Sequence, residues 1–229
     1  MERMEAQPLI TYQHVSISLQ GQEILSDVNF ELKKGEFVYL IGKVGSGKST
    51  FLKTLYGEVE INDGEAQVLG YPVRHMKRKD LPTLRRKLGI VFQDFQLLTD
   101  RTVHENLKFV LKATGWKSRV EIEKRIEEVL RQVGMENKGY KMPNELSGGE
   151  QQRIVIARAI LNQPDIILAD EPTGNLDVET GRHIVELLQD ICRQGSAIIM
   201  TTHNLNLLSE YPGKVYKCEE HRLTETVNS

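Results

Sequence analysis

The sequence lacks any long hydrophobic run. Its longest purely apolar stretches, such as IILA at 166–169 and AIIM at 197–200, are far shorter than the roughly 20 residues that a bilayer-spanning helix needs. The first ten residues, MERMEAQPLI, carry charges of both signs and no apolar core, unlike a secretory signal. These absences predict a cytosolic protein that does not cross a membrane.

Cysteine and excess charge are also scarce. The 229 residues include only Cys192 and Cys218, without CxxC or metal-ligand spacing, so we expect small buried side chains rather than a disulfide. The formal net charge is -2, which provides no overall basic field to attract nucleic acid. Binding of other molecules must therefore depend on local sites.

What the sequence does contain is an alternation of strand and helix patterns. Three apolar runs, EFVYLI at 36–41, DIILADE at 165–171 and SAIIMTT at 196–202, are typical of buried strands. Helix patterns follow the first two runs, with Gly57 and Gly195 as their stops. Because each strand is apolar on both faces, the pattern predicts an α/β fold with a parallel sheet covered on both sides.

Two regions differ from this core. Residues 97–157 are interpreted as a mostly helical insertion, in which residues 118–134 have apolar side chains at helical spacing, a possible capping box of Ser118 with Glu121, and Gly134 as the stop. The first thirty-odd residues and residues 59–75 alternate more weakly and contain turn signals, which suggests a small antiparallel sheet. The core with this sheet would then comprise residues 1–96 and 158–229.

A phosphate-binding loop is the most specific chemical signal. GKVGSGKS at 42–49 fits GxxxxGK[ST], follows a predicted strand and opens a predicted helix. A flexible glycine turn is the alternative, but this setting suits a loop whose backbone wraps phosphates while Lys48 reaches the terminal ones and the Ser49 hydroxyl ligates Mg²⁺. We expect nucleotide contacts from Gly42, Lys43, Val44, Gly45, Ser46, Gly47, Lys48, Ser49 and Thr50.

Polar residues follow three of the apolar runs. Asp170 and Glu171 come after IILA, and with the phosphate loop present we expect Asp170 to hold Mg²⁺ and Glu171 to orient an attacking water as a base. His203 ends the third strand of the same unit, where ligands of open α/β sheets gather, although a lone histidine is more often structural. Gln93 follows the apolar GIVF, and its side-chain oxygen could meet a metal or water, while an exposed glutamine is the plainer interpretation.

The segment LSGGEQQR at 146–153 is a second candidate anion site. Its adjacent glycines expose backbone amides, and a helix that starts there adds unpaired N–H groups and a positive dipole end. The phosphate loop, however, lies about a hundred residues earlier in the chain.

Five motifs, in the order GKVGSGKST, VFQ, LSGGEQQR, ILADEPTGNLD and TTH, together resemble the nucleotide-binding subunit of ABC transporters. The resemblance covers essentially the whole chain. It implies one ATPase domain over residues 1–229 with a RecA-like P-loop NTPase core, using ATP and Mg²⁺. It also implies a head-to-tail homodimer in which LSGGEQQR closes over the ATP of the other copy, which answers why this segment lies far from the phosphate loop in the sequence.

The resemblance assigns roles to individual positions. Ser147, Gly148 and Gly149 would approach the γ-phosphate held by the other copy, and Asp177 would belong to the loop that crosses the dimer, although a helix N-cap is an equally physical reason for that aspartate. Glu171 corresponds to the catalytic base, His203 to the switch histidine, Gln93 to the glutamine that senses Mg²⁺ and the membrane partner, and Asp170 to the second acidic motif. The chain departs from the family at Leu19, where an aromatic usually stacks on adenine. The preference between ATP and GTP is therefore open.

Within this family, ADEPTGNLD resembles the branch that includes FtsE, LolD and MacB, and VFQDFQLLTDRTVHEN resembles the FtsE cell-division group. This implies a cytoplasmic subunit, peripheral on the inner membrane, with a permease partner resembling FtsX and a role in controlling peptidoglycan hydrolysis. A LolD-like lipoprotein-release system or a MacB-like efflux system is the alternative. A soluble ABC-type regulator acting on DNA or ribosomes fits less well, because such proteins usually carry two nucleotide domains or long coiled coils.

A basic run, RHMKRKDLPTLRRK at 74–87, has three interpretations. The run can form a solvated helix face, a surface that faces anionic lipid headgroups, or a patch that binds nucleic acid. The first is the commonest, and the absence of interleaved aromatic residues disfavours the third.

Overall fold

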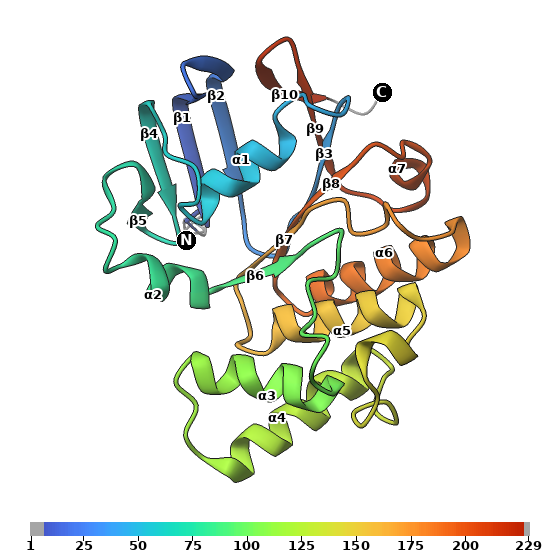
Figure 1. Cartoon of the computed structure of the whole chain (residues 1–229). Coiled ribbons are helices and arrows are strands. Elements are labelled where there is room, and N and C mark those ends of the chain that lie inside the picture. Colours follow the sequence, from blue (N-terminus) through green and yellow to red (C-terminus); the bar gives the residue numbers. More distant parts are fainter. Residues whose placement is uncertain (1–6, 227–229) are drawn as a thin grey trace, which may run out of the picture.

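The computed structural model describes residues 7–226, which form two sheets and the helices around them (Figure 1). Residues 1–6, part of the segment that argues against a secretory signal, lie outside the described residues. The antiparallel sheet has the order β2-β1-β4-β5, formed by Gln22–Leu32, Ile10–Leu19, Asp63–Val68 and Tyr71–Pro72. The second sheet has the order β10-β9-β3-β8-β7-β6, formed by Arg222–Thr226, Lys214–Glu219, Phe37–Ile41, Ala197–Thr202, Ile166–Ala169 and Leu88–Val91.

The second sheet is parallel from β9 to β6, and only β10 runs against its neighbour. The three predicted strands lie side by side as β3, β8 and β7, each with consecutive buried residues. Successive side chains enter opposite cores, since Tyr39 and Ile198 pack in one hydrophobic cluster while Leu40 and Ile199 pack in the other. The predicted α/β class is therefore confirmed.

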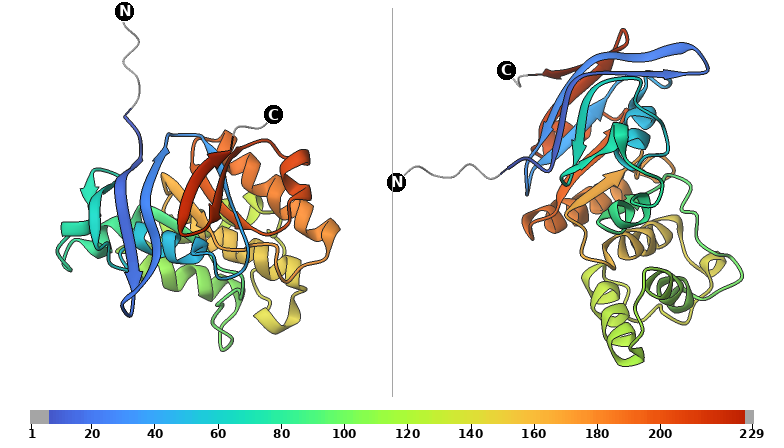
Figure 2. Two further views of the ribbon diagram at one scale, coloured as in Figure 1. Left: turned by 90° about the horizontal axis from the view of Figure 1, so that it is seen from above. Right: turned by 90° about the vertical axis from the view of Figure 1, so that its left-hand side faces the viewer.

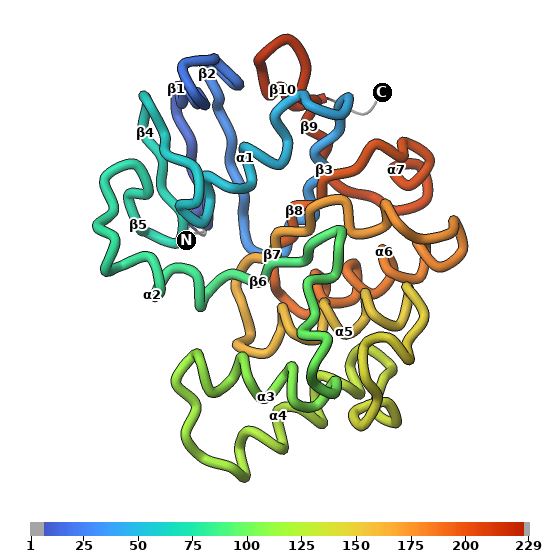
Figure 3. Tube along the Cα trace, in the orientation of Figure 1, coloured from blue at the N-terminus to red at the C-terminus, as the bar shows by residue number. Residues whose placement is uncertain are grey.

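Helices cover both faces of the parallel sheet. On one face α1 (Lys48–Leu55) inserts Phe51, Leu52 and Leu55 into the cluster that joins the two sheets. On the other face α5 (Gly148–Ile160) and α6 (Val178–Arg193) pack in the second cluster, and Ile184 and Leu188 of α6 are fully buried. The small helices α2 (Leu81–Arg86) and α7 (Asn206–Glu210) lie at the margins (Figures 1 and 3).

The region predicted to be a helical insertion contains α3 (Val103–Ala113) and α4 (Arg119–Gln132), which lie at the end of the molecule away from the antiparallel sheet (Figures 1 and 2). Gly134 follows α4 with a φ of 70°, as expected of a helix stop. The boundary expected at residue 157 falls inside α5, which continues to Ile160. Figure 3 follows the chain from β6 through residues 92–102, which have no helix or strand, into α3.

The N-caps differ in part from expectation. Ser118 caps α4 by accepting from Glu121 N at 3.3 Å, so one of the two bonds of the expected capping box is present. Complete capping boxes occur instead at Thr102 with Glu105 and at Ser147 with Glu150. Within residues 7–226, no helix is long and apolar enough to cross a membrane.

Candidate nucleotide site

The segment between β3 and α1 folds as a tight loop around its glycines. Gly42, Gly45 and Gly47 have φ values of 149°, 82° and 106°, a region that favours glycine. A Cβ on Gly42 would lie 2.4 Å from the Cys218 carbonyl oxygen of β9. Position 42 therefore requires glycine for its conformation and for the close approach of β9.

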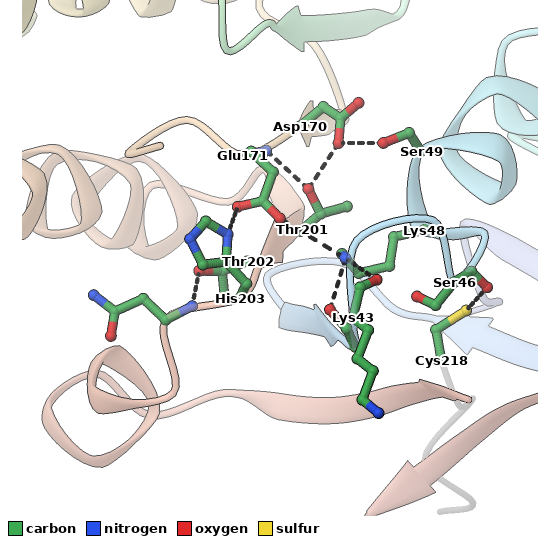
Figure 4. A network of polar contacts seen from close by, with 12 residues as sticks. Lys43, Ser46, Lys48, Ser49, Asp170, Glu171, Thr201, Thr202, His203 and Cys218 are labelled. Atoms are coloured by element: carbon green, nitrogen blue, oxygen red, sulfur yellow. Dashed lines mark hydrogen bonds and ion pairs between the residues drawn. The ribbon is translucent and has the colours of Figure 1, made fainter. Parts of the chain in front are cut away.

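Lys48 begins α1 and turns back over this loop. Its ammonium group donates to the carbonyl oxygens of Gly42 at 2.8 Å and Lys43 at 3.1 Å, and lies 3.8 Å from Glu171 Oε1. The residue is only 6% exposed. The folded chain thus holds a buried cation at the mouth of the loop, with one carboxylate close to it (Figure 4).

The carboxyl ends of β7 and β8 bring the two acids to the same place. Ser49 Oγ donates to Asp170 Oδ1 at 2.9 Å, joining α1 to the end of β7. Thr201 Oγ1 donates to the same oxygen at 2.8 Å and accepts from Glu171 N at 2.8 Å (Figure 4). Thr201 was not predicted as a site residue. It is fully buried and fixes both acids, but the TTH pattern carries no sign of this cross-strand role.

Glu171 has a strained backbone, and its carboxylate lies near His203 as well as Lys48. Its φ is 47°, in the left-handed region that non-glycine residues rarely adopt and that is common at functional sites. Its Oε2 lies 3.0 Å from His203 Nδ1, which follows β8, and the side chain is 15% exposed while that of His203 is 60% exposed (Figure 4). Such a carboxylate can accept a proton from a water held above the loop.

The loop and its surroundings fit a nucleoside triphosphate. Ser46 Oγ is a buried hydroxyl without a hydrogen-bond partner in the described chain, so it has bonding capacity for a further group. The glycines leave the backbone of the loop open, and α1 presents its N-terminus there. A cavity of about 710 Å³ adjoins the loop and is lined by Val44, His203, Leu205 and Lys217 among others. Ser49 and Asp170 supply the oxygen ligands that Mg²⁺ prefers.

Gln93 lies on the loop after β6 and is exposed. Its Nε2 donates to Asn175 Oδ1 at 3.3 Å, and Asn175 Nδ2 donates to the Gln93 carbonyl oxygen at 3.0 Å. Gln93 and Asp170 also line one cavity of about 550 Å³. The structure therefore brings Gln93 to the acidic side of the site, and its contact with Mg²⁺ stays a prediction.

The hydrogen bonds of Ser147 in the LSGGEQQR segment are local to the start of α5. Ser147 Oγ accepts from Glu150 N at 3.3 Å, and Ser147 N donates to Glu150 Oε2 at 2.9 Å. The hydrogen bond from Ser147 N to the Glu150 carboxylate and the Lys138 ammonium lower the pKa of Glu150. A Cβ on Gly149 would lie 2.4 Å from the Thr180 methyl of α6. Among the residues that the structure describes, no hydrogen bond or ion pair joins 147–149 to 42–50.

Asp177 is the N-cap of α6. Its carboxylate accepts from Thr180 N at 2.9 Å and from Thr180 Oγ1 at 2.6 Å, and these bonds lower its pKa. The capping explanation raised by the sequence is therefore sufficient for an aspartate here. A role across a dimer stays a prediction.

The aromatic position also has a clear structural setting. Leu19 is the last residue of β1 and is 39% exposed, while Tyr12 is 1% exposed and its hydroxyl lies 3.0 Å from Thr54 Oγ1. Burial raises the Tyr12 pKa far above its ordinary value. Tyr12 is thus part of the core, and the approach of a base to Leu19 stays a prediction.

Part of the basic run 74–87 is used in local packing. Arg74 pairs with Asp63 at 3.1 Å, and Arg85 Nε donates to the Tyr56 carbonyl oxygen at 2.9 Å. Residues 77–79 are exposed.

The chain is similar to known proteins in sequence and in fold. The family model described as ABC transporter matches residues 25–174. A cell division ATP-binding protein FtsE from Streptococcus pneumoniae is 45% identical over 203 residues, 89% of this chain and 88% of the relative. A solved dimeric, post-hydrolysis ATP-binding cassette bound to ADP and Pi has a TM-score of 0.83 at 33% identity, covering 95% of this chain and 97% of that one. CbiO1 from Clostridium perfringens, part of the ABC transporter complex cbiONQ, has a TM-score of 0.88 at 28% identity, covering 96% and 88%.

Proposed function

Since the chain belongs to the ABC transporter family and is an ATP-binding, ATP-hydrolysing subunit of it, we propose that it is the FtsE-like ATPase of a cell-division complex. In this proposal it works with a membrane permease resembling FtsX and regulates peptidoglycan hydrolysis. The 45% identity to an FtsE over 89% of the chain is the observation that carries the division role. We place the protein on the cytoplasmic face of the inner membrane, as a peripheral subunit.

The chemistry proposed for the site is direct attack of water on the γ-phosphate of ATP. Glu171 orients the water and takes its proton, with His203 holding the carboxylate at 3.0 Å. The new P–O bond forms to the water oxygen, the bond to the β-phosphate oxygen breaks, and ADP and phosphate leave. Lys48 moves from the carbonyl oxygens of the loop to the phosphate oxygens and stabilises their charge. Ser49 and Asp170, with Gln93 beside them, would hold Mg²⁺, whose charge offsets that of the phosphates.

A second copy of the chain completes this site in the proposal. The dimeric state of a related cassette supports it. Because Ser147 Oγ accepts from Glu150 N, its own hydrogen is free to donate to a phosphate oxygen of the other copy, alongside the amides of Gly148 and Gly149. ATP would then join the two copies head to tail.

A groove beside Gln93 suits the permease. It has a volume of about 500 Å³ and lies between α2 and β6 on one side and α3 and α5 on the other, with Arg85, Phe92, Val110 and Arg158 among its lining residues. A segment seated there would contact the loop that carries Gln93, so closure of the ATP site can move the membrane partner.

Affinity purification from detergent-solubilised native membranes tests the division role. The bait is the Glu171→Gln chain loaded with ATP and Mg²⁺, and captured proteins are identified by mass spectrometry. We expect a small permease resembling FtsX. Recovery of a lipoprotein-release or efflux permease would replace the purpose while keeping the ATPase, and recovery of no membrane protein would favour a soluble regulator.

A further inference from the structure

Gln152 of α5 is a buried polar side chain that has no assigned role in the nucleotide site. It is 0% exposed. Its Nε2 donates to the Pro172 carbonyl oxygen at 2.8 Å and to the Phe92 carbonyl oxygen at 3.4 Å, while its Oε1 has no hydrogen-bond partner in the described part of the chain. A buried, unsatisfied carbonyl destabilises a fold, so the stability of α5 is a poor reason for this residue.

The surroundings of the amide require a donor of two hydrogens. Both contacts are carbonyl oxygens, so a flipped amide would point oxygen at oxygen. A carboxylate would be repelled there, and an apolar side chain would leave both carbonyl groups without this donor. The arrangement therefore depends on the NH₂ group, and the unpartnered Oε1 accompanies it.

The two carbonyl groups belong to the segments that carry the expected catalytic side chains. Phe92 directly precedes Gln93, and Pro172 directly follows Glu171. One side chain of α5 thus joins the backbone beside both residues.

Arg158, further along α5, holds the other side of the same loop. Its guanidinium donates to the carbonyl oxygens of Phe95 at 3.0 Å and Gln96 at 2.5 Å. Phe95 and Gln96 have φ values of 58° and 50°, which non-glycine residues adopt only when their surroundings hold them. Helix α5 therefore forms hydrogen bonds to the backbone of this loop both before and after Gln93.

We propose that Gln152 is a positioning residue that fixes Gln93 and Glu171 of its own chain to the helix whose N-terminus, Ser147, serves the ATP site of the other copy. The part concerning the other copy rests on the proposed homodimer. Occupancy of one site would then set the geometry of the second through a single helix, because α5 carries Ser147 at its start and Gln152 about one and a half turns later.

Mixed dimers separate the two directions of this link. In the first mixture, a chain with Gln152→Met and an intact Glu171 is combined with an excess of a Glu171→Gln chain. In the second, a wild-type chain is combined with an excess of a chain that carries both Glu171→Gln and Gln152→Met. The chains of each mixture are combined before ATP is added. Nearly every active site that forms on ATP binding then has the Gln152→Met change in its own chain in the first mixture and in the facing helix in the second.

We expect turnover per active site to fall between about 10-fold and 10²-fold in the first mixture, as for a misplaced catalytic group, and to stay within about twofold of the unmodified mixture in the second. An equal loss in both mixtures, or no loss in either, would overturn the positioning role. Gln189→Met on α6 is the matched control, because Gln189 is also a buried amide that donates to a proline carbonyl oxygen, that of Pro212 at 3.0 Å, and it lies outside both 92–96 and LSGGEQQR.

Two further readouts keep this test independent of the dimer. Light scattering with ATP measures dimerisation alone, and its absence contradicts the proposed homodimer. The Gln152→Met chain by itself then decides the positioning role. A lower kcat with an unchanged KM for ATP supports it, while kcat and KM equal to those of Gln189→Met overturn it. Thermal unfolding of both variants shows whether the fold is retained.

Discussion

His203 Nδ1 and Glu171 Oε2 lie 3.0 Å apart, which joins the end of β8 to the residue after Asp170. The same carboxylate has its other oxygen 3.8 Å from the Lys48 ammonium. Glu171 is thus positioned by two side chains from different elements, and its backbone has a strained φ of 47°. This geometry supports the role of a fixed base, which takes a proton without having to reorganise.

Glu171→Gln is the direct test of that base. The amide keeps the size of the side chain but accepts no proton, so we expect ATP binding to persist and hydrolysis to slow by about 10²-fold or more. Phosphate release and equilibrium ATP binding measure the two effects. Glu186→Gln, which alters a carboxylate bonded to the Tyr211 hydroxyl on the surface, should leave turnover unchanged. Turnover of the Glu171 variant within a few-fold of the parent would remove Glu171 from this role.

Leu19→Tyr should strengthen ATP binding. An aromatic ring at this 39% exposed position could stack on adenine, and base stacking contributes about 1–3 kcal/mol, or roughly 5-fold in Kd at its lower end. Titration with a fluorescent ATP analogue and competition by ATP and GTP would measure affinity and base preference. Val120→Tyr, at a 78% exposed position on α4, is the control. Equal affinities of the parent and Leu19→Tyr would show that the base does not lie at β1.

The acid stability of the helical region should depend on Glu123. Lys108 Nζ and His104 Nε2 bond to its carboxylate at 2.7 and 2.5 Å, and they lower its pKa to about 2. Between that value and the ordinary pKa of about 4.3 the unfolded chain binds more protons. The stabilisation is therefore complete above pH 4.3 and is lost as the pH falls through 2.

Glu123→Gln removes this dependence. The side chain is 36% exposed, so solvent screening limits the stabilisation to roughly 0.2–1 kcal/mol. Urea unfolding at pH 6 and pH 3 should show a smaller difference between the two pH values for Glu123→Gln than for the parent. Glu127→Gln on the same helix is the comparison. Equal pH dependence in the parent and Glu123→Gln would contradict the assigned interaction.

The phosphate loop could be predicted from sequence because its requirements are local. The glycines at 42, 45 and 47 adopt the unusual φ values, and Lys48 follows at the spacing that the loop needs. The buried strands could be predicted for a similar reason, since Tyr39 and Leu40 are both apolar and both buried. Sequence neighbours decide such features.

Features that depend on distant segments could not be predicted. Thr201 holds Asp170 across two strands, and Gln152 joins residues 92 and 172, which only the fold brings together. The β9–β10 hairpin also gave no turn signal, because its turn uses Glu220 and His221 at φ values of 49° and 60° where glycine or asparagine is usual. The capping box at Ser147 could have been predicted from the sequence, since Ser147 and Glu150 have the required S-x-x-E spacing.

Ser147→Arg should abolish ATP-driven dimerisation while ATP still binds. The hydroxyl lost in this variant has two roles, as the N-cap of α5 and as the proposed donor to the γ-phosphate of the other copy. Loss of a cap alone costs about 1 kcal/mol of stability, and the added arginine would occupy the space that the facing nucleotide needs. Light scattering with ATP, in the Glu171→Gln background that we expect to bind ATP without hydrolysing it quickly, measures the dimer.

A matched variant separates these two roles. Ser118 caps α4 in the same way, accepting from Glu121 N at 3.3 Å as Ser147 accepts from Glu150 N at 3.3 Å. Ser118→Arg should therefore lower the free energy of unfolding by a similar amount and leave the ATP dimer intact. If both variants lose the dimer, the effect lies in helix stability; if neither does, LSGGEQQR does not face the ATP of a second copy. Loss in Ser147→Arg alone assigns the segment to the interface.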